Sequence, residues 1–222
     1  MIRVAALFVD KRGPYANRPD VDAWDIERDA RKYNGPYPVV AHPPCQRWGR
    51  YWSGGPNPKA QRFVLGDDDG CFESALTSVR RWGGVLEHPE ASHAFREYGL
   101  GEPPRAGEWV VADSQDGWIC CVEQGHYGHP ARKATWLFAT CASRVYVEDA
   151  CPANIPDLIW GPSSGQRLDE GFHSKAERLA ARAAGVPPRK RLSTVQNIVT
   201  PRAFAELLIG LARNSRAQER AA

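Results

Sequence analysis

The sequence predicts an α/β protein with a doubly wound, mainly parallel sheet. Residues 2–9 (IRVAALFV) form a continuous apolar run rich in β-branched residues, which is typical of a strand buried on both faces of a parallel sheet. Residues 39–41, 71–82 and 85–87 then follow as a short strand, an amphipathic helix and another strand. This order is the pattern of a βαβ unit, in which a helix crosses one face of the sheet between two parallel strands.

Short apolar runs bounded by turn residues predict the other strands. Together with residues 2–9, the predicted strands are residues 21–24, 39–41, 85–87, 118–123 and 135–140. The strand at 39–41 ends before Pro43 and Pro44, because proline has no N–H to donate to a neighbouring strand. The last two strands are close in the chain, so we expect an antiparallel pair at the edge of the sheet. Residues 99–116 are polar and contain Gly and Pro, which predicts a loop.

The spacing of apolar residues and of capping residues predicts the helices. They are residues 26–33, residues 71–82, residues 173–184 and a last helix whose first position is Pro201. In residues 71–82, Phe72 and Val79 lie on one helical face, and Gly83-Gly84 ends the helix. Thr200 is the expected N-cap of the last helix.

The length of 222 residues predicts one α/β domain over residues 1–213, followed by a polar tail at 214–222. A net charge of +3 allows a nucleic-acid partner without requiring one. No apolar run reaches the ~20 residues of a membrane span, and no signal-peptide pattern is present. We therefore expect a soluble, cytoplasmic protein with no membrane partner. The six cysteines contain no C-x-x-C pair, so we predict reduced thiols and no metal site.

Cys45 and Glu87 are the candidate reactive residues. Cys45 lies just after the strand at 39–41, and Glu87 ends the strand at 85–87. Ligands of open α/β sheets bind outside the carboxyl ends of the strands, so we expect both side chains at one edge. Each residue also has a structural alternative, since cysteines are often buried and a carboxylate can form a structural salt bridge.

Four segments, in chain order, resemble motifs of the DNA cytosine-5 methyltransferases, especially short phage-type members. They are residues 43–46 (PPCQ), residues 85–89 (VLEHP), residues 127–135 (YGHPARKAT) and residues 194–201 (TVQNIVTP). The resemblance covers residues 38–213 and implies a Rossmann-like methyltransferase fold. The chain departs from the family after its first strand, where residues 10–14 (DKRGP) replace a glycine-rich loop. The expected fold is therefore truncated at the cofactor loop, and we interpret the chain as a divergent member.

The resemblance implies a DNA-modifying transferase that acts on carbon C5 of cytosine. Cys45 would add to C6 of a base flipped out of the helix, and Glu87 would contact the N3 side of that base. Lys133 or Arg132 would hold the base or a phosphate. The cofactor would be S-adenosylmethionine, for which the candidate binding residues are Asp10, Asp25 and Asn197. The candidate substrate-binding residues are Pro44, Gln46, Arg47, Trp48, His88, Tyr127 and Thr135.

Positive charge near Cys45 would be needed to favour the thiolate, and Arg47, Arg50 and His42 are the candidates for it. Two other functions stay open at this point. Residues 142–171 are short for a target-recognition domain, which favours a free pyrimidine nucleotide as substrate, with another donor. The missing glycine-rich loop favours a degenerate protein that only binds DNA.

Overall fold

The computed structural model describes residues 2–53, 62–114, 116–140, 158–165, 175–186 and 192–217. These residues form one seven-stranded sheet in the order β2-β1-β3-β4-β7-β6-β5. The strands are β1 (Val4–Leu7), β2 (Val21–Trp24), β3 (Val39–Ala41), β4 (Gly84–Pro89), β5 (Val110–Val111), β6 (Trp118–Glu123) and β7 (Ala134–Thr140). Strands β2, β1, β3 and β4 pair in parallel, whereas β7, β6 and β5 add antiparallel pairings. The sheet is thus mixed, and the α/β class is confirmed.

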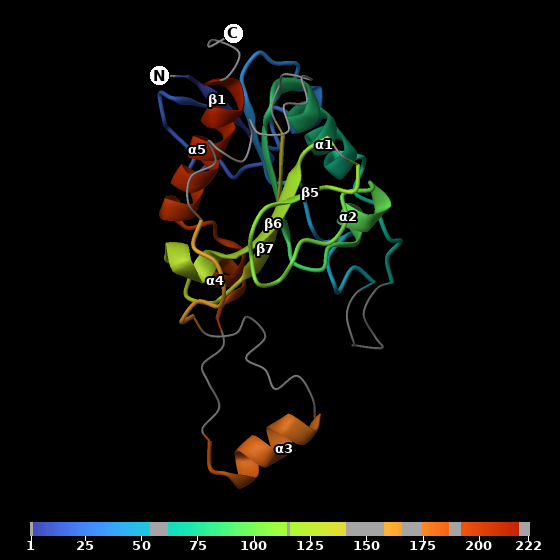
Figure 1. Cartoon of the computed structure of the whole chain (residues 1–222), viewed down its shortest axis with the longest axis vertical. Helices are drawn as coiled ribbons and strands as arrows, with labels where there is room; N and C mark the ends of the chain where they lie inside the picture. Colours follow the sequence, from blue (N-terminus) through green and yellow to red (C-terminus); the bar gives the residue numbers. More distant parts are fainter. Residues whose placement is uncertain are drawn as a thin grey trace.

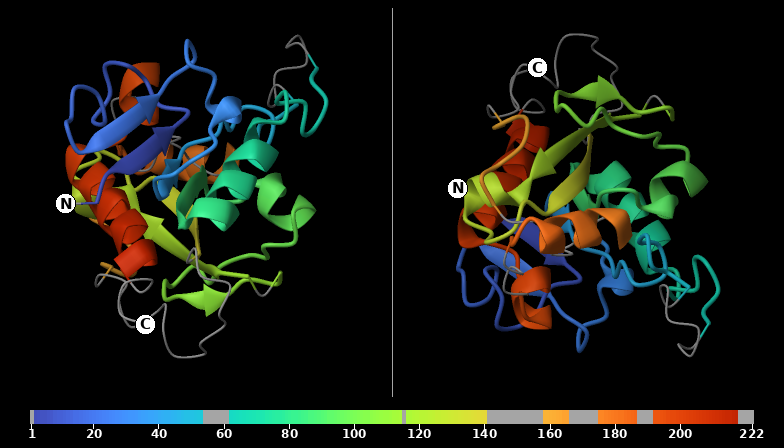
Figure 2. Two further views of the ribbon diagram at one scale, coloured as in Figure 1. Left: turned by 90° about the horizontal axis from the view of Figure 1, so that it is seen from above. Right: turned by 90° about the horizontal axis from the view of Figure 1, so that it is seen from below.

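Helices cover both faces of this sheet (Figure 1). The helices are α1 (Cys71–Trp82), α2 (His93–Glu97), α3 (Lys175–Ala183), α4 (Thr194–Ile198) and α5 (Arg202–Ala217), with 3-10 turns η1 (Ala30–Lys32) and η2 (Gln124–Tyr127). Figure 2 shows α1 and α5 on opposite sides of the sheet. In the part of the chain that the structure describes, no helix is long and apolar enough to span a membrane.

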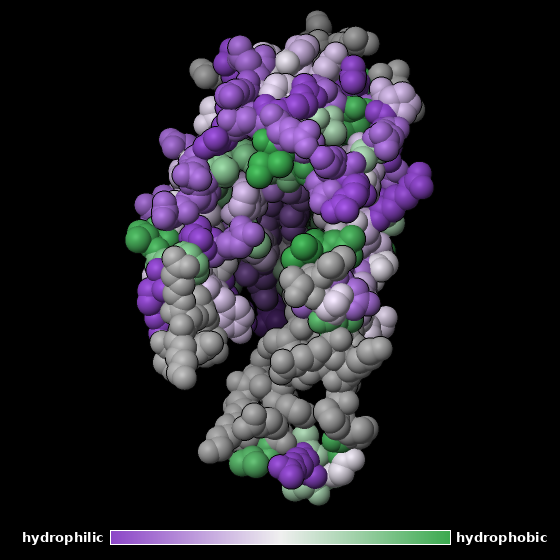
Figure 3. Space-filling model, turned by 180° about the vertical axis from the view of Figure 1, so that it is seen from behind, coloured by the Kyte–Doolittle hydropathy of each residue, from purple (hydrophilic) through white to green (hydrophobic). Residues whose placement is uncertain are grey.

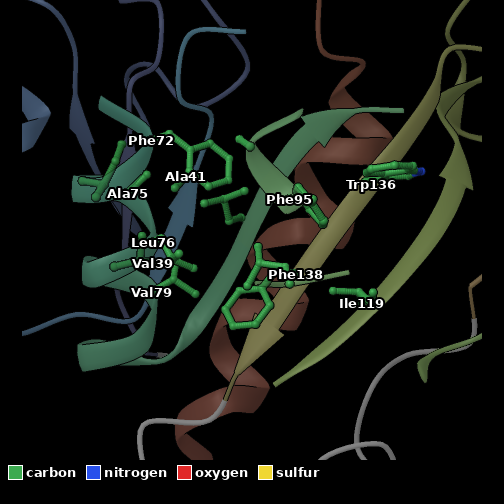
Figure 4. Packing of buried hydrophobic residues seen from close by; sticks show 14 of the residues in the cluster. Val39, Ala41, Phe72, Ala75, Leu76, Val79, Phe95, Ile119, Trp136 and Phe138 are labelled. Atoms are coloured by element: carbon green, nitrogen blue, oxygen red, sulfur yellow. The ribbon is translucent and has the colours of Figure 1, made fainter. Parts of the chain in front are cut away.

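Alternating side chains of the strands divide the core into two layers. Val39 and Ala41 of β3 pack with α1, whereas Val40 between them packs with α5. Figure 4 shows Phe72 and Leu76 of α1 next to these β3 residues. This alternation follows from the two-residue period of a strand, so neighbouring residues at a strand end serve opposite faces of the sheet. On one face of the molecule, the surface has a hollow lined by hydrophilic residues (Figure 3).

Two expected elements differ in the structure. Residues 26–33 form only the short turn η1, because Asp29 adopts left-handed backbone angles with φ 54° and interrupts a continuous helix. Asp25 also accepts hydrogen bonds from two following N–H groups, which closes a turn instead of starting a helix. The expected loop at 99–116 contains strand β5, which pairs with β6 and makes β5 the edge strand.

Three other elements differ from the expected bounds. Phe8 has φ 59° and ends β1 at Leu7, so the first strand is shorter than residues 2–9. The last helix continues to Ala217, past the expected domain boundary at Arg213. The expected helix at 173–184 begins outside the described residues, and α3 covers Lys175–Ala183.

Gly84 allows β3 and β4 to approach each other. Its φ is +129°, and a Cβ at this position would lie 1.9 Å from the backbone oxygen of Val39. Gly84 and Val39 are also partners in the strand register. Only a residue without a side chain fits here.

We expect Gly84→Ala to lower the free energy of unfolding by roughly 3 kcal/mol or more, since the added carbon strains the backbone and separates two core strands. Urea unfolding measures this change. Gly210→Ala is the matched control, because Gly210 is inside α5 and an added Cβ would have no atom within 4 Å. Alanine in a helix is more stable than glycine by about 0.5–1 kcal/mol. Equal stabilities of the two variants would contradict this account.

Candidate active site

The strand register brings Glu87 and the segment before Cys45 together. Ala41 pairs with Leu86, so the next residues, His42 and Glu87, are neighbours on adjacent parallel strands. The Nδ1 of His42 lies 2.9 Å from Oε2 of Glu87. Cys45 follows His42 after the two prolines, and its side chain is exposed. Cys45 and Glu87 therefore belong to the same carboxyl edge of the sheet.

A chain of buried hydrogen bonds holds the Glu87 carboxylate. Nδ1 of His42 donates to this carboxylate, and Nε2 of His42 forms a hydrogen bond with the hydroxyl of Tyr15, at 2.8 Å. Nε2 of Gln124 donates to Oε1 of Glu87 at 3.2 Å and lies 3.0 Å from Oγ1 of Thr135. Tyr15, Gln124 and Thr135 are at most 1% exposed. Both oxygens of Glu87 are thus fixed from the protein interior.

Sequence reasoning missed most of this network. Tyr15 belongs to an irregular segment between β1 and β2, and Gln124 belongs to the turn after β6, so neither shows a local motif. His42 was expected as a source of positive charge for Cys45, but in the structure it pairs with Glu87. The one available signal was the position of His42 directly after strand β3, at the ligand-binding edge.

Lys133 supplies positive charge to the cluster. Burial lowers the pKa of Lys133, while Glu87 and Cys45 raise it. Burial alone would raise the pKa of Glu87, but the hydrogen bond from His42 and the charges of His42 and Lys133 lower it, so Glu87 is ionised at neutral pH. Desolvation, and then the charge of Glu87, raise the pKa of Cys45, whereas Lys133 acts in the opposite direction. Cys45, Glu87 and Lys133 therefore form one electrostatic unit.

The basic candidates, expected either near the thiol or on the base and phosphate, take different places. Nζ of Lys133 donates to the backbone oxygens of Ile198 and Val199, at 3.3 and 3.1 Å, which ties the segment after α4 to the site. Arg132 has an exposed side chain. The guanidinium of Arg47 lies 3.6 Å from the centre of the Phe63 ring. Among the basic candidates, Lys133 is the one that interacts with both Cys45 and Glu87.

Two expected substrate contacts lie in the core on the α1 face. Trp48 is 5% exposed, and its ring N–H donates to Asp68 at 2.8 Å. His88 is fully buried, pairs with Ser92 Oγ at 2.7 Å, and meets the Phe72 ring edge-on. Neither ring has a face open for stacking on a base.

Of the remaining expected contacts, three lie at the site and one packs against α5. Pro44 and Gln46 flank Cys45 and are exposed. Thr135 belongs to the hydrogen-bond network described above. Tyr127 instead packs against Phe204 of α5, and its hydroxyl accepts from the backbone N–H of Ile159.

The residues after β1 do not fit the way in which the resembled family holds S-adenosylmethionine. Between β1 and β2 the chain forms turns without a helix, and Tyr15 from this segment is buried against the sheet edge. One oxygen of Asp10 accepts from the N–H of Arg12, and one oxygen of Asp25 accepts from two N–H groups, so both carboxylates close local turns. Asn197 keeps a buried Oδ1 without a hydrogen-bond partner in the described residues.

No group of His, Cys, Asp and Glu residues within the described ranges could hold a metal ion. Cys141 and Cys151 lie outside those ranges, and so do the consecutive basic residues Arg189, Lys190 and Arg191. Comparison with known proteins finds no family model, no curated protein and no solved structure that matches this chain.

The electrostatic coupling predicts opposite effects of two substitutions on the reactivity of Cys45. Glu87→Gln removes a charge that raises the pKa of Cys45, so alkylation by iodoacetamide at pH 8 is expected to become about threefold faster. Lys133→Gln removes the opposing charge and is expected to slow the alkylation of Cys45. Intact-protein and peptide mass spectrometry give the rates. Cys71 in α1 is the internal control, and a slower Cys45 reaction in Glu87→Gln would refute the coupling.

Burial of His88 predicts acid sensitivity. Desolvation lowers the pKa of His88 to about 4, from an ordinary value of 6.5. The unfolded chain therefore binds a proton between these pH values that the folded chain does not, and stability present above pH 6.5 falls as the pH drops towards 4. Between pH 7 and 4.5 this group alone removes about 2 kcal/mol.

His88→Asn tests this assignment, because asparagine can pair with Ser92 and does not titrate in this range. Urea unfolding at pH 7 and pH 4.5 should show a smaller acid loss in the variant than in the wild type. Comparing the free energies of unfolding at the two pH values cancels any loss of stability that does not depend on pH. Parallel losses in both proteins would show that His88 is not the titrating group.

Proposed function

We propose that this chain is a cytosine C5-modifying enzyme of the DNA cytosine-5 methyltransferase type, with a Rossmann-like fold. The observation that supports the proposal is the convergence of Cys45, Glu87 and Lys133 at one sheet edge, from the ends of β3 and β4 and the start of the antiparallel β7. A nucleophile, a carboxyl group and a cation are the groups that addition to an electron-poor pyrimidine requires.

The residues of the site have distinct roles in this reaction. The thiolate of Cys45 forms a bond to C6 of cytosine, and the displaced electron pair is accepted at N3 as that nitrogen takes a proton. Glu87 faces N3 and passes on the proton that the Cys45 thiol releases as it becomes the thiolate. His42, at 2.9 Å, holds the carboxyl group in place. C5 then forms a bond to the transferred group, and the bond between that group and the donor breaks. Loss of the protons at C5 and N3 and cleavage of the sulfur–C6 bond restore the aromatic base and the free thiolate.

Tyr15 and Gln124 act as positioning residues for Glu87. They hold His42 on one side and the second carboxylate oxygen on the other, so the carboxyl group does not have to reorganise during the attack. Lys133 lowers the pKa of Cys45 and stabilises its thiolate. In this role it replaces the arginines that were expected from the sequence.

The group added to cytosine, and not the fold, identifies the donor. S-adenosylmethionine is the donor that the sequence resemblance implies, and the turns after β1 leave its usual loop unformed. The proposed macromolecular partner is DNA, with the target base flipped out. The proposed location is the cytoplasm, and the proposed origin is a phage genome.

Nucleoside analysis of DNA from cells that express the protein tests the proposal directly. We expect a modified cytosine that disappears in Cys45→Ala, because the covalent addition to C6 needs the thiolate. The mass added to the nucleoside identifies the transferred group. Cys71→Ala is the matched control and should keep the product, since Cys71 is a half-buried cysteine of α1. A product that persists in Cys45→Ala would exclude Cys45 as the nucleophile.

A further inference from the structure

A second feature opens at the same edge of the sheet, on the α1 face. A cleft of about 380 Å³ is lined by residues that include Arg50, Glu90, His93, Arg96, Arg105 and Trp136. Its volume lies within the range of small-ligand sites. None of these residues belongs to the hydrogen-bond network of Glu87.

The cleft shares three segments with the Cys45 cluster, and α2 and residues 102–105 complete its lining. Arg50 follows Cys45 in one loop, and Glu90 follows Glu87 after strand β4. Trp136 lies in β7, three residues after Lys133, and pairs with His88 of β4. Since a strand rises about 3.3 Å per residue, three residues separate the two features by roughly 10 Å along the chain. A nucleotide held at Cys45 can therefore reach this cleft.

The lining of the cleft favours an anion. Arg96 pairs with Glu102 at 2.6 Å, and Arg105 pairs with Glu90 at 3.4 Å. Arg50 has no carboxylate partner in the part of the chain that the structure describes, so one guanidinium group is left uncompensated.

Trp136 adds a neutral donor to this lining. It is 6% exposed, and its ring nitrogen points away from Phe95 and from the core (Figure 4). No acceptor for this N–H is found among the described residues. A planar guanidinium group and an indole N–H are both donors that match the oxygens of a phosphate.

We propose that this cleft binds a phosphate group of the nucleotide substrate, with Arg50 as its principal cation. The inference rests on the proposed function, because it assumes a cytosine nucleotide at Cys45. The phosphate has two sources, which are the 5′-phosphate of the target nucleotide itself and a neighbouring phosphodiester of a strand. The cleft would bind the phosphate oxygens in the same way in both cases, and the competition experiment distinguishes the two sources.

Fluorescence anisotropy with a labelled single-stranded deoxyoligonucleotide containing cytosine measures the binding. We expect Arg50→Gln to weaken binding about tenfold at moderate salt, as for the loss of one charge-assisted hydrogen bond. The slope of log affinity against log salt should also become smaller by about one. Arg81→Gln is the matched control, because Arg81 is an exposed arginine at the far end of α1 and should leave binding unchanged.

Competition with dCMP and with deoxycytidine identifies the source of the phosphate. If dCMP competes better than deoxycytidine and loses this advantage in Arg50→Gln, the cleft holds the nucleotide's own phosphate. If Arg50→Gln weakens only the oligonucleotide, the cleft holds a neighbouring phosphodiester. Equal affinities of Arg50→Gln and the wild type for all three ligands would overturn the proposal.

The binding measurement requires no turnover, so it separates this inference from the proposed function. Loss of binding in Arg50→Gln without any modified cytosine in the DNA would support the cleft and refute the C5 chemistry. A modified cytosine that depends on Cys45, together with unchanged binding in Arg50→Gln, would support the chemistry and refute the cleft.

Discussion

The buried carboxylate of Glu87 is the constraint on which the arrangement of the site depends. A carboxylate removed from water is costly unless hydrogen bonds and opposite charge stabilise it. His42 and Gln124 each hold one of its oxygens, and these two side chains are held in turn by Tyr15 and Thr135. Four residues from other parts of the chain therefore hold one carboxyl group. The result is a fixed, ionised acid next to an exposed thiol, which is an arrangement suited to chemistry more than to stability.

Because side chains alternate along β4, two neighbouring residues of this strand have different roles on the two faces of the sheet. Glu87 faces the α5 side, where it is held for reaction, while the adjacent His88 faces the α1 side and packs as a neutral ring between Phe72 and Ser92. A ligand can touch groups of both faces only where the strands end, which is where the Cys45 loop lies. The phosphate-binding cleft proposed for the α1 face and the Cys45 cluster on the other face are therefore compatible with a single nucleotide that passes over the sheet edge.

Local patterns of the sequence predicted the fold better than they predicted the site. The apolar spacing of residues 71–82 and the run at 118–123 match α1 and β6, because both patterns depend on neighbours a few residues away. The helix expected at 26–33 was wrong because the left-handed Asp29 interrupts it. The partners of Glu87 lie far from it in sequence, with Tyr15 in an irregular segment, so no local period indicates them.

Tyr15 helps to hold Glu87 and also restricts where a donor can bind. Its hydroxyl reaches His42 only because the segment after β1 stays close to the sheet edge, with the ring buried. A glycine-rich loop that holds a cofactor in that position would need the same space, since ligands of open α/β sheets bind outside the ends of the central strands. The two arrangements exclude each other at this point of the fold. In the proposed reaction, a donor therefore has to approach the cytosine without displacing Tyr15. Otherwise its binding releases His42 and, with it, the hydrogen bond that keeps Glu87 ionised and in place.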